Sequence, residues 1–102
     1  MIELHLRGRV APGRREELTE FLAEAIPFYE EPGGIRVRVL WSLENDTDFI
    51  EVIEYADQET HDRDQVRGED DPRMQSLLTR WRALLDGPPA VERYGVSWSP
   101  TR

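Results

Sequence analysis

The 102-residue sequence contains no cysteine and no lysine. Without cysteine there is no disulfide, no thiolate nucleophile and no zinc–sulfur site. Without lysine, a Schiff-base mechanism on a side-chain amine is excluded. Histidine is also scarce, because His5 and His61 are the only two. A metal site that needs two or three histidines from one chain is therefore not expected.

The sequence also has fewer basic than acidic residues and no long hydrophobic run. The formal net charge is -8 and the isoelectric point is about 4.7, which argues against nucleic acid or an anionic membrane as a partner. No apolar run approaches the ~20 residues that a membrane-spanning helix requires, and residues 2–10 are too short and too charged for a signal peptide. We therefore predict a cytoplasmic protein.

Four segments have the alternating pattern of strands. In residues 35–41, Ile35, Val37, Val39 and Trp41 alternate with arginines, and this period of two in β-branched and aromatic residues is typical of a strand. Residues 48–55 follow after a polar break that favours a turn. Together these two segments predict a hairpin, and residues 2–10 and 90–98 predict the first and last strands.

Two segments have the period of amphipathic helices. The first presents one apolar face and reaches Pro27, which should end or kink it. The second begins at Asp71-Pro72, a helix cap followed by the proline that suits a first turn, and stops before Gly87. Its predicted core residues are Met74, Leu77, Leu78, Trp81, Leu84 and Leu85. In the acidic stretch between strand and helix, we predict a short helix followed by a loop from Gly68 to Asp71.

The resulting order is βαββαβ, the split βαβ or ferredoxin-like arrangement of the α+β class. It predicts a four-stranded antiparallel sheet in the order 4-1-3-2, with two helices on one face. Residues 1–98 would form one domain and residues 99–102 a short tail.

The two faces of this sheet predict a partner. With Ile50 and Val52 under the helices, the opposite face would carry His5 and several arginines together with Phe49, Glu51, Ile53 and Tyr55. Sliding the third strand by one residue would place Glu54 there instead of Glu51. Aromatic residues left in water would favour a second sheet packing over them, and hence a homodimer.

Residues 2–98 resemble the dimeric α+β barrel superfamily, which includes the antibiotic-biosynthesis-monooxygenase and NIPSNAP types. The similarity lies in Val10-Ala-Pro-Gly-Arg-Arg-Glu-Glu-Leu, in Phe49-Ile-Glu-Val-Ile-Glu-Tyr-Ala-Asp and in Asp71-Pro72. The resemblance implies two sheets paired face to face in a barrel. It also implies a hydrophobic or aromatic small-molecule ligand and no cofactor.

The candidate catalytic residues are His5, Glu51 and Tyr55. A strand histidine beside Arg7 and near Glu51 can act as a general base, and Tyr55 can donate a proton or line a pocket. The alternative is that these residues form an ion-pair network and aromatic contacts within a dimer interface.

Four further residues are candidates for ligand binding: Arg7, Arg38, Trp41 and Trp81. The arginines can orient an anionic substrate, and the tryptophans can wall a pocket for a planar ligand, although core packing is the alternative for both tryptophans. We assign no metal site, because His61 and its neighbouring carboxylates lie in an acidic surface segment.

Two hypotheses follow. In the first, the protein is a homodimeric, cofactor-free barrel that binds a hydrophobic or aromatic metabolite and catalyses proton transfer or oxygenation. In the second, it is a non-catalytic dimeric module with a structural or regulatory role. A cavity beside His5, or between the sheet and the helices, distinguishes them.

Overall fold

A computed structural model describes residues 1–98 and 100. Within this part of the chain, β1 (Ile2–Arg9), β2 (Ile35–Trp41), β3 (Asp48–Tyr55) and β4 (Ala90–Gly95) form one antiparallel sheet in the order β2-β3-β1-β4. The helices are α1 (Arg15–Glu30), α2 (Gln58–Asp70) and α3 (Pro72–Ala83). The predicted ferredoxin-like α+β fold and strand order are thus confirmed, and residues 99, 101 and 102 of the predicted tail lie outside the described residues.

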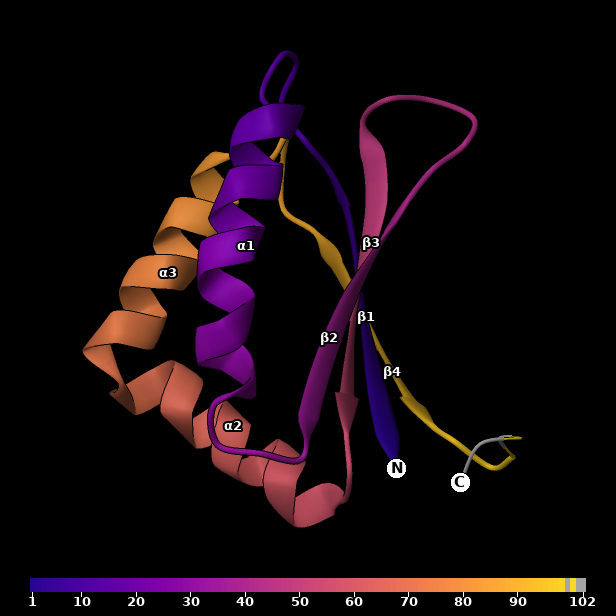
Figure 1. Ribbon diagram of the computed structural model, residues 1–102, viewed down its shortest axis with the longest axis vertical. Coiled ribbons are helices and arrows are strands. Elements are labelled where there is room, and N and C mark those ends of the chain that lie inside the picture. Colours follow the sequence, from indigo (N-terminus) through magenta and orange to yellow (C-terminus); the bar gives the residue numbers. More distant parts are fainter. Residues whose placement is uncertain (99, 101–102) are drawn as a thin grey trace.

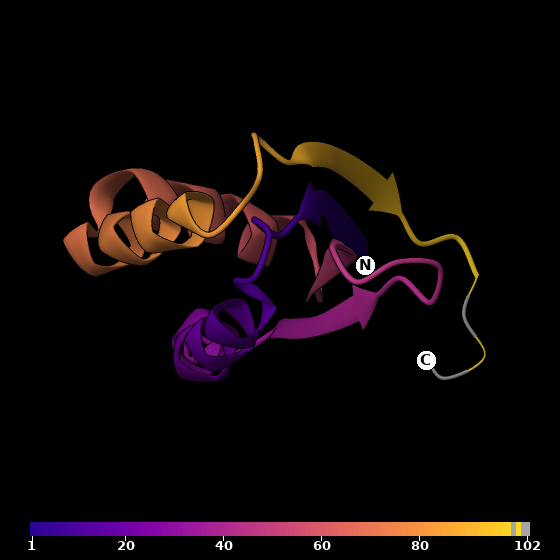
Figure 2. The ribbon, with the colours of Figure 1, turned by 90° about the horizontal axis from the view of Figure 1, so that it is seen from above.

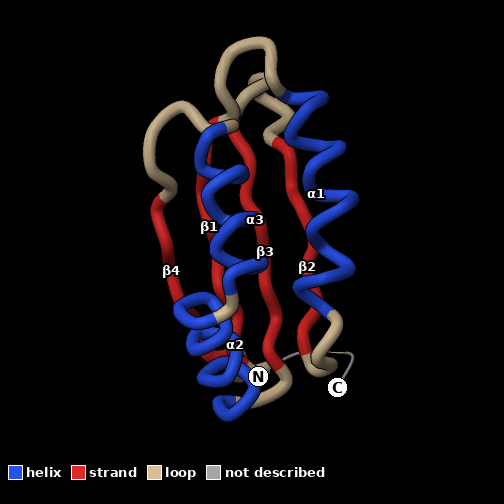
Figure 3. Tube along the Cα trace, turned by 90° about the vertical axis from the view of Figure 1, so that its left-hand side faces the viewer, coloured by secondary structure: helices blue, strands red, loops and turns tan. Residues whose placement is uncertain are grey.

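The helices form a layer on one face of the sheet (Figure 1). Seen from above, α1 lies on the β2 side and α3 on the side of β1 and β4 (Figure 2). The α2 helix lies across the lower end of this layer (Figure 3). The sheet therefore has a helix-covered face and an outer face that none of these three helices covers.

Two helix boundaries differ from the prediction. Pro27 does not end α1, which continues to Glu30 and buries Phe28 and Tyr29. Gly68 lies inside α2 rather than in a loop. In both places a tertiary contact overrides the local propensity, because the Arg67 guanidinium of α2 donates hydrogen bonds to the Phe28 and Tyr29 carbonyls at the end of α1.

The start of α3 is as predicted. The Asp71 carboxylate accepts hydrogen bonds from the backbone N–H groups of Arg73 at 2.8 Å and Met74 at 3.4 Å, which satisfies donors that a helix leaves free at its first turn. The predicted core residues of this segment are buried, apart from Leu78, which is partly buried.

The facing of β3 was the main error of the sequence analysis. Leu6 pairs with Glu51 on one side and Val39 pairs with Glu51 on the other, so all three share the helix-covered face. Phe49, Ile53 and Tyr55 lie on the same face, and Ile50, Val52 and Glu54 lie on the outer one. Placing Ile50 and Val52 under the helices was wrong, and the register that puts Glu54 on the outer face is the one observed.

This facing removes the original reason for a dimer. Phe49 and Tyr55 are 2% and 1% exposed in the single chain, because the helices cover them. Phe49 and Tyr55 are therefore not solvent-exposed aromatic residues that a second sheet would have to cover. The outer face has fewer exposed apolar side chains than the sequence analysis expected. Among them are Leu40, which is 42% exposed, and Tyr94, which is 46% exposed.

Candidate active site

A cavity of about 340 Å³ lies between the helix-covered face of the sheet and the helices. Leu4 and Leu6 form part of its floor, and α3 forms the facing wall with Met74, Leu78, Trp81 and Arg82. The α2 helix closes one end. At the mouth, Val91 of β4 is 59% exposed. The volume of this cavity lies within the range of small-molecule sites, which are mostly apolar with a few polar groups.

Glu51 is the one acidic residue among the strand residues that line the cavity. Its neighbours across the sheet are Leu6 and Val39, and the residue is only 3% exposed. Removal of the carboxylate from water disfavours its charged form, so burial raises the pKa of Glu51 from 4.5 to about 7. Near neutral pH this carboxyl group exists in both protonation states, as a general acid or base requires.

Three cavity-lining residues have a buried side-chain atom with no hydrogen-bond partner among the described residues. The atoms are Oε1 of Glu51, the indole Nε1 of Trp81 on α3 and Oδ1 of Asp64. Buried polar groups are normally hydrogen-bonded, since an unsatisfied one costs roughly 1–3 kcal/mol. Glu51 and Trp81 thus bring an unpartnered acceptor and an unpartnered donor to residues that line one apolar cavity.

Tyr55 forms the end of the cavity nearest α2. Its hydroxyl donates a 2.5 Å hydrogen bond to Oδ2 of Asp64, and Arg67 lies 3.6 Å from the other carboxylate oxygen of Asp64. Burial, and then the Asp64 hydrogen bond, raise the pKa of Tyr55. The Tyr55 phenol is therefore neutral, and its hydroxyl proton is engaged in the hydrogen bond to Asp64.

Tyr29 is a second phenol on the cavity wall. Burial raises its pKa, and the nearby Glu51 carboxylate raises it further. It comes from the last turn of α1, beyond Pro27. Because Tyr29 extends the apolar spacing of Leu18, Leu22 and Ala25, that spacing could have identified it.

The structure separates the candidate catalytic and ligand-binding residues into groups. Glu51, Tyr55 and Trp81 line the cavity. His5 lies on the outer face, where its Nε2 is 2.7 Å from the Glu3 carboxylate and its ring lies 4.9 Å from that of Tyr94. The predicted proximity of His5 and Glu51 was wrong, because the sheet lies between their side chains.

The predicted arginine cluster around Glu51 was wrong for the same reason. On the outer face, Arg7 donates a 2.5 Å hydrogen bond to Glu92, and Arg38 lies 3.8 Å from Glu54. Each of these arginines has a carboxylate neighbour of its own. Neither faces the cavity.

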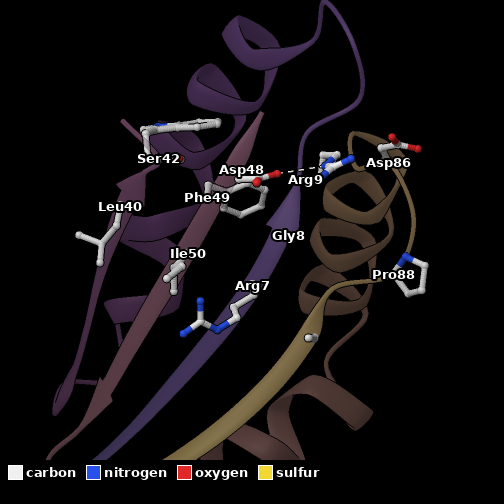
Figure 4. A pocket seen from close by; sticks show the side chains of 12 residues that line it. Arg7, Gly8, Arg9, Leu40, Ser42, Asp48, Phe49, Ile50, Asp86 and Pro88 are labelled. Atoms are coloured by element: carbon white, nitrogen blue, oxygen red, sulfur yellow. Dashed lines mark hydrogen bonds and ion pairs between the residues drawn. The ribbon is translucent and has the colours of Figure 1, made fainter. Parts of the chain in front are cut away.

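Trp41 lies at a different hollow, near the end of β2. This open hollow of about 620 Å³ also includes Arg7, Arg9, Asp48 and Phe49, and Figure 4 shows the 3.0 Å ion pair that joins Arg9 to Asp48 across it. The Arg15 guanidinium lies 4.1 Å from the centre of the Trp41 ring. Trp41 therefore does not wall the same pocket as Trp81.

A family model described as antibiotic biosynthesis monooxygenase matches residues 1–63 of the chain. The chain belongs to the antibiotic biosynthesis monooxygenase family. The matched segment includes β1, α1 and the hairpin with Glu51 and Tyr55, whereas the cavity wall formed by α3 lies beyond it. No curated protein sequence matches the chain.

Solved structures show the same fold at low sequence identity. A variant of SnoaB, a cofactor-independent oxygenase from Streptomyces nogalater, has a TM-score of 0.82 at 17% identity and covers 99% of this chain and 97% of its own. Rv0793 from Mycobacterium tuberculosis has a TM-score of 0.78 at 19% identity, with 98% of both chains covered. A conserved protein from Methanosarcina mazei Go1 has a TM-score of 0.77 at 18% identity, over 91% of this chain and 89% of that one.

Sequence reasoning missed three charged residues that line this family member's cavity, namely Asp64, Glu69 and Arg82. Asp64 belongs to the stretch that the sequence analysis treated as an acidic surface segment, whereas its carboxylate accepts a hydrogen bond from the Tyr55 hydroxyl. Arg82 was not singled out, although it lies four residues after Leu78 on the cavity-facing stripe of α3. Among the described residues, no group of three or more His, Cys, Asp or Glu side chains is placed to hold a metal ion.

Proposed function

We propose that this member of the antibiotic biosynthesis monooxygenase family is a cofactor-independent oxygenase of hydrophobic, aromatic metabolites, with Glu51 as its general base. The observation that carries the proposal is the buried, unpartnered Glu51 carboxyl group in an apolar cavity. The description of SnoaB as a cofactor-independent oxygenase supports the reaction class.

The Glu51 carboxylate would remove a proton from an acidic C–H group beside an aromatic ring. The carbanion that remains would transfer electrons to molecular oxygen and form a C–O bond. Loss of water from the resulting peroxide completes a balanced reaction, in which one methylene group and one oxygen molecule give one carbonyl group and one water. The protein's part is to take up the proton and to exclude bulk water from the carbanion.

Trp81 and the two tyrosines would orient the substrate. The free indole N–H of Trp81 can donate a hydrogen bond to an oxygen of the substrate, which would gain negative charge as the proton leaves. Tyr55 cannot serve as the base, because its neutral phenol donates to Asp64. Glu51 therefore takes the role that the sequence analysis gave to His5.

The test is oxygen uptake with a panel of fused-ring phenols, hydroquinones and benzylic C–H acids, combined with oxygen-18 labelling of the product. Wild-type protein should place one atom of molecular oxygen in the product. Glu51→Gln should abolish turnover while retaining the fold, since glutamine has a similar shape and no basic oxygen. His5→Gln is the matched control on the other face and should remain active. Full activity of Glu51→Gln, or loss only in His5→Gln, would refute the assignment.

We also propose that the protein forms a homodimer through the outer face of its sheet. The support is that none of the described helices covers this face, and that it presents Leu40 and Tyr94 beside paired charges. Analytical ultracentrifugation at micromolar concentration tests this, and a single species of about 11.9 kDa would refute it.

Among the described residues, no helix has the length and hydropathy to cross a membrane.

A further inference from the structure

Arg82 occupies an unusual position at the mouth of the cavity. The cavity-facing residues of α3 are Met74, Leu78, Trp81 and Arg82, which have the spacing of one helical face. The first three are apolar or aromatic, so the stripe predicts another apolar residue at its end. Instead it ends in an exposed guanidinium, the one cationic side chain among those that line the cavity.

No ion pair engages this guanidinium within residues 1–98 and 100. The acidic residues that line the cavity, other than Glu51, are Asp64 and Glu69 of α2. Arg82 lies eight residues beyond Met74, about 12 Å along α3 at the rise of an α-helix. The α2 helix lies at the lower end of α3, whereas Arg82 lies near its upper end (Figure 1). The cavity thus has acidic side chains at one end and a free cation at the other.

Stabilisation of the helix end does not by itself explain Arg82. A basic residue in the last turn interacts favourably with the helix dipole, and Arg80 shares that position. Arg80, however, is 2.8 Å from the Glu24 carboxylate and lies over the Phe21 ring on the α1 side. The two arginines have the same place in the helix but different surroundings, and only Arg82 borders the cavity.

We propose that Arg82 is a specificity-determining residue that selects aromatic ligands carrying an anionic group, such as a carboxylate. The aromatic body would lie in the cavity beside Trp81, and the anionic group would reach the mouth and pair with the guanidinium. A net charge of -8 would otherwise repel such a ligand, which makes the local cation necessary. This inference rests on the proposed function of the cavity and names its substrate class.

The experiment compares two fluorescent probes with the same aromatic skeleton, anilinonaphthalene sulfonate and neutral N-phenylnaphthylamine. Both are titrated at pH 6, below the pKa of Glu51, so that the cavity carboxyl group is mainly neutral. Arg82→Gln should weaken sulfonate binding about five- to tenfold and leave binding of the neutral probe unchanged. Added salt should weaken sulfonate binding in wild type but much less in Arg82→Gln.

Arg80→Gln is the matched control, because it removes a cation from the same helical turn and should change neither affinity. Energy transfer locates the bound probe when Trp41→Phe and Trp98→Phe leave Trp81 as the one tryptophan. If Arg82→Gln and Arg80→Gln bind both probes alike, while Trp81 still transfers energy to the neutral probe, the role of Arg82 is refuted and the cavity stands. If neither probe receives energy from Trp81, both this inference and the proposed ligand cavity fail.

Discussion

Replacing Glu51 by glutamine should change how the stability of the protein depends on pH. A folded-state pKa of about 7, against 4.5 for the unfolded chain, means that the folded state holds a proton which the unfolded state has already lost. The contribution of Glu51 to the free energy of unfolding is favourable at pH values below the unfolded-state pKa, where the carboxyl group is neutral in both states. It is lost progressively as the pH rises from about 4.5 to about 7 and is constant above that.

The size of this effect follows from the pKa difference. At about 1.36 kcal/mol per pKa unit, the rise from 4.5 to about 7 corresponds to a loss of roughly 3 kcal/mol in the free energy of unfolding. Glutamine has no charge to lose, so Glu51→Gln should lack this decline. The free energy of unfolding of the variant, relative to wild type, should therefore rise by about 3 kcal/mol between pH 4.5 and pH 8.

The assay is urea unfolding of both proteins at one protein concentration, at closely spaced pH values from 4.5 to 8. The pH-dependent difference between the two proteins carries the information, because any packing cost of the amide is the same at every pH. Glu54→Gln is the matched control, since Glu54 lies three residues along β3 on the outer face. The Glu54→Gln variant should show the same dependence of unfolding free energy on pH as the wild type. A constant difference between wild type and Glu51→Gln across this range would refute the view that Glu51 is a buried, neutral acid.

Three further predictions concern the fold, and each is measured by chemical denaturation. Gly8→Ala should destabilise by about 1–3 kcal/mol, because a Cβ atom there would lie 2.8 Å from the buried Phe49 ring; Gly95→Ala, with nothing within 4 Å, should cost much less. Gly68→Ala should stabilise by about 0.5–1 kcal/mol, since the position is inside a helix and has open space around it; destabilisation would contradict this. Asp71→Ala should cost about 1 kcal/mol through loss of the α3 cap, and Asp71→Asn should retain most of that stability.

The elements of this fold could be predicted from the sequence because their patterns are strong and local. Alternation identified the strands, and Asp71-Pro72 fixed the start of α3. Pro27 and Gly68 were misjudged because Arg67 joins α2 to the end of α1. A contact between residues so far apart in the chain leaves no mark in a local pattern.

The facing of β3 could not be decided from its own residues. Each of its faces carries one glutamate together with apolar residues, so the period of two fits either choice. We placed Ile50 and Val52 under the helices, whereas the observed facing buries Glu51 there at a cost in free energy. The larger apolar surface of Phe49 and Tyr55 outweighs that cost, and the Glu51 carboxyl can lower it further by taking up a proton. Glu51, Tyr55 and Trp81 were named as candidates and line one cavity, but they were grouped with His5 and arginines that lie on the other face.

The composition of the two cavity walls has a consequence for engineering. The floor belongs to paired strands, where a change of backbone would disturb a ladder of hydrogen bonds, whereas the opposite wall is one stripe of side chains on α3. Substitutions at Met74, Leu78 and Arg82 can therefore reshape the space for a ligand without altering strand pairing. The fold thus places a buried carboxyl group on the strands and a separate lining on α3, which makes α3 the natural segment to randomise when new ligands are sought.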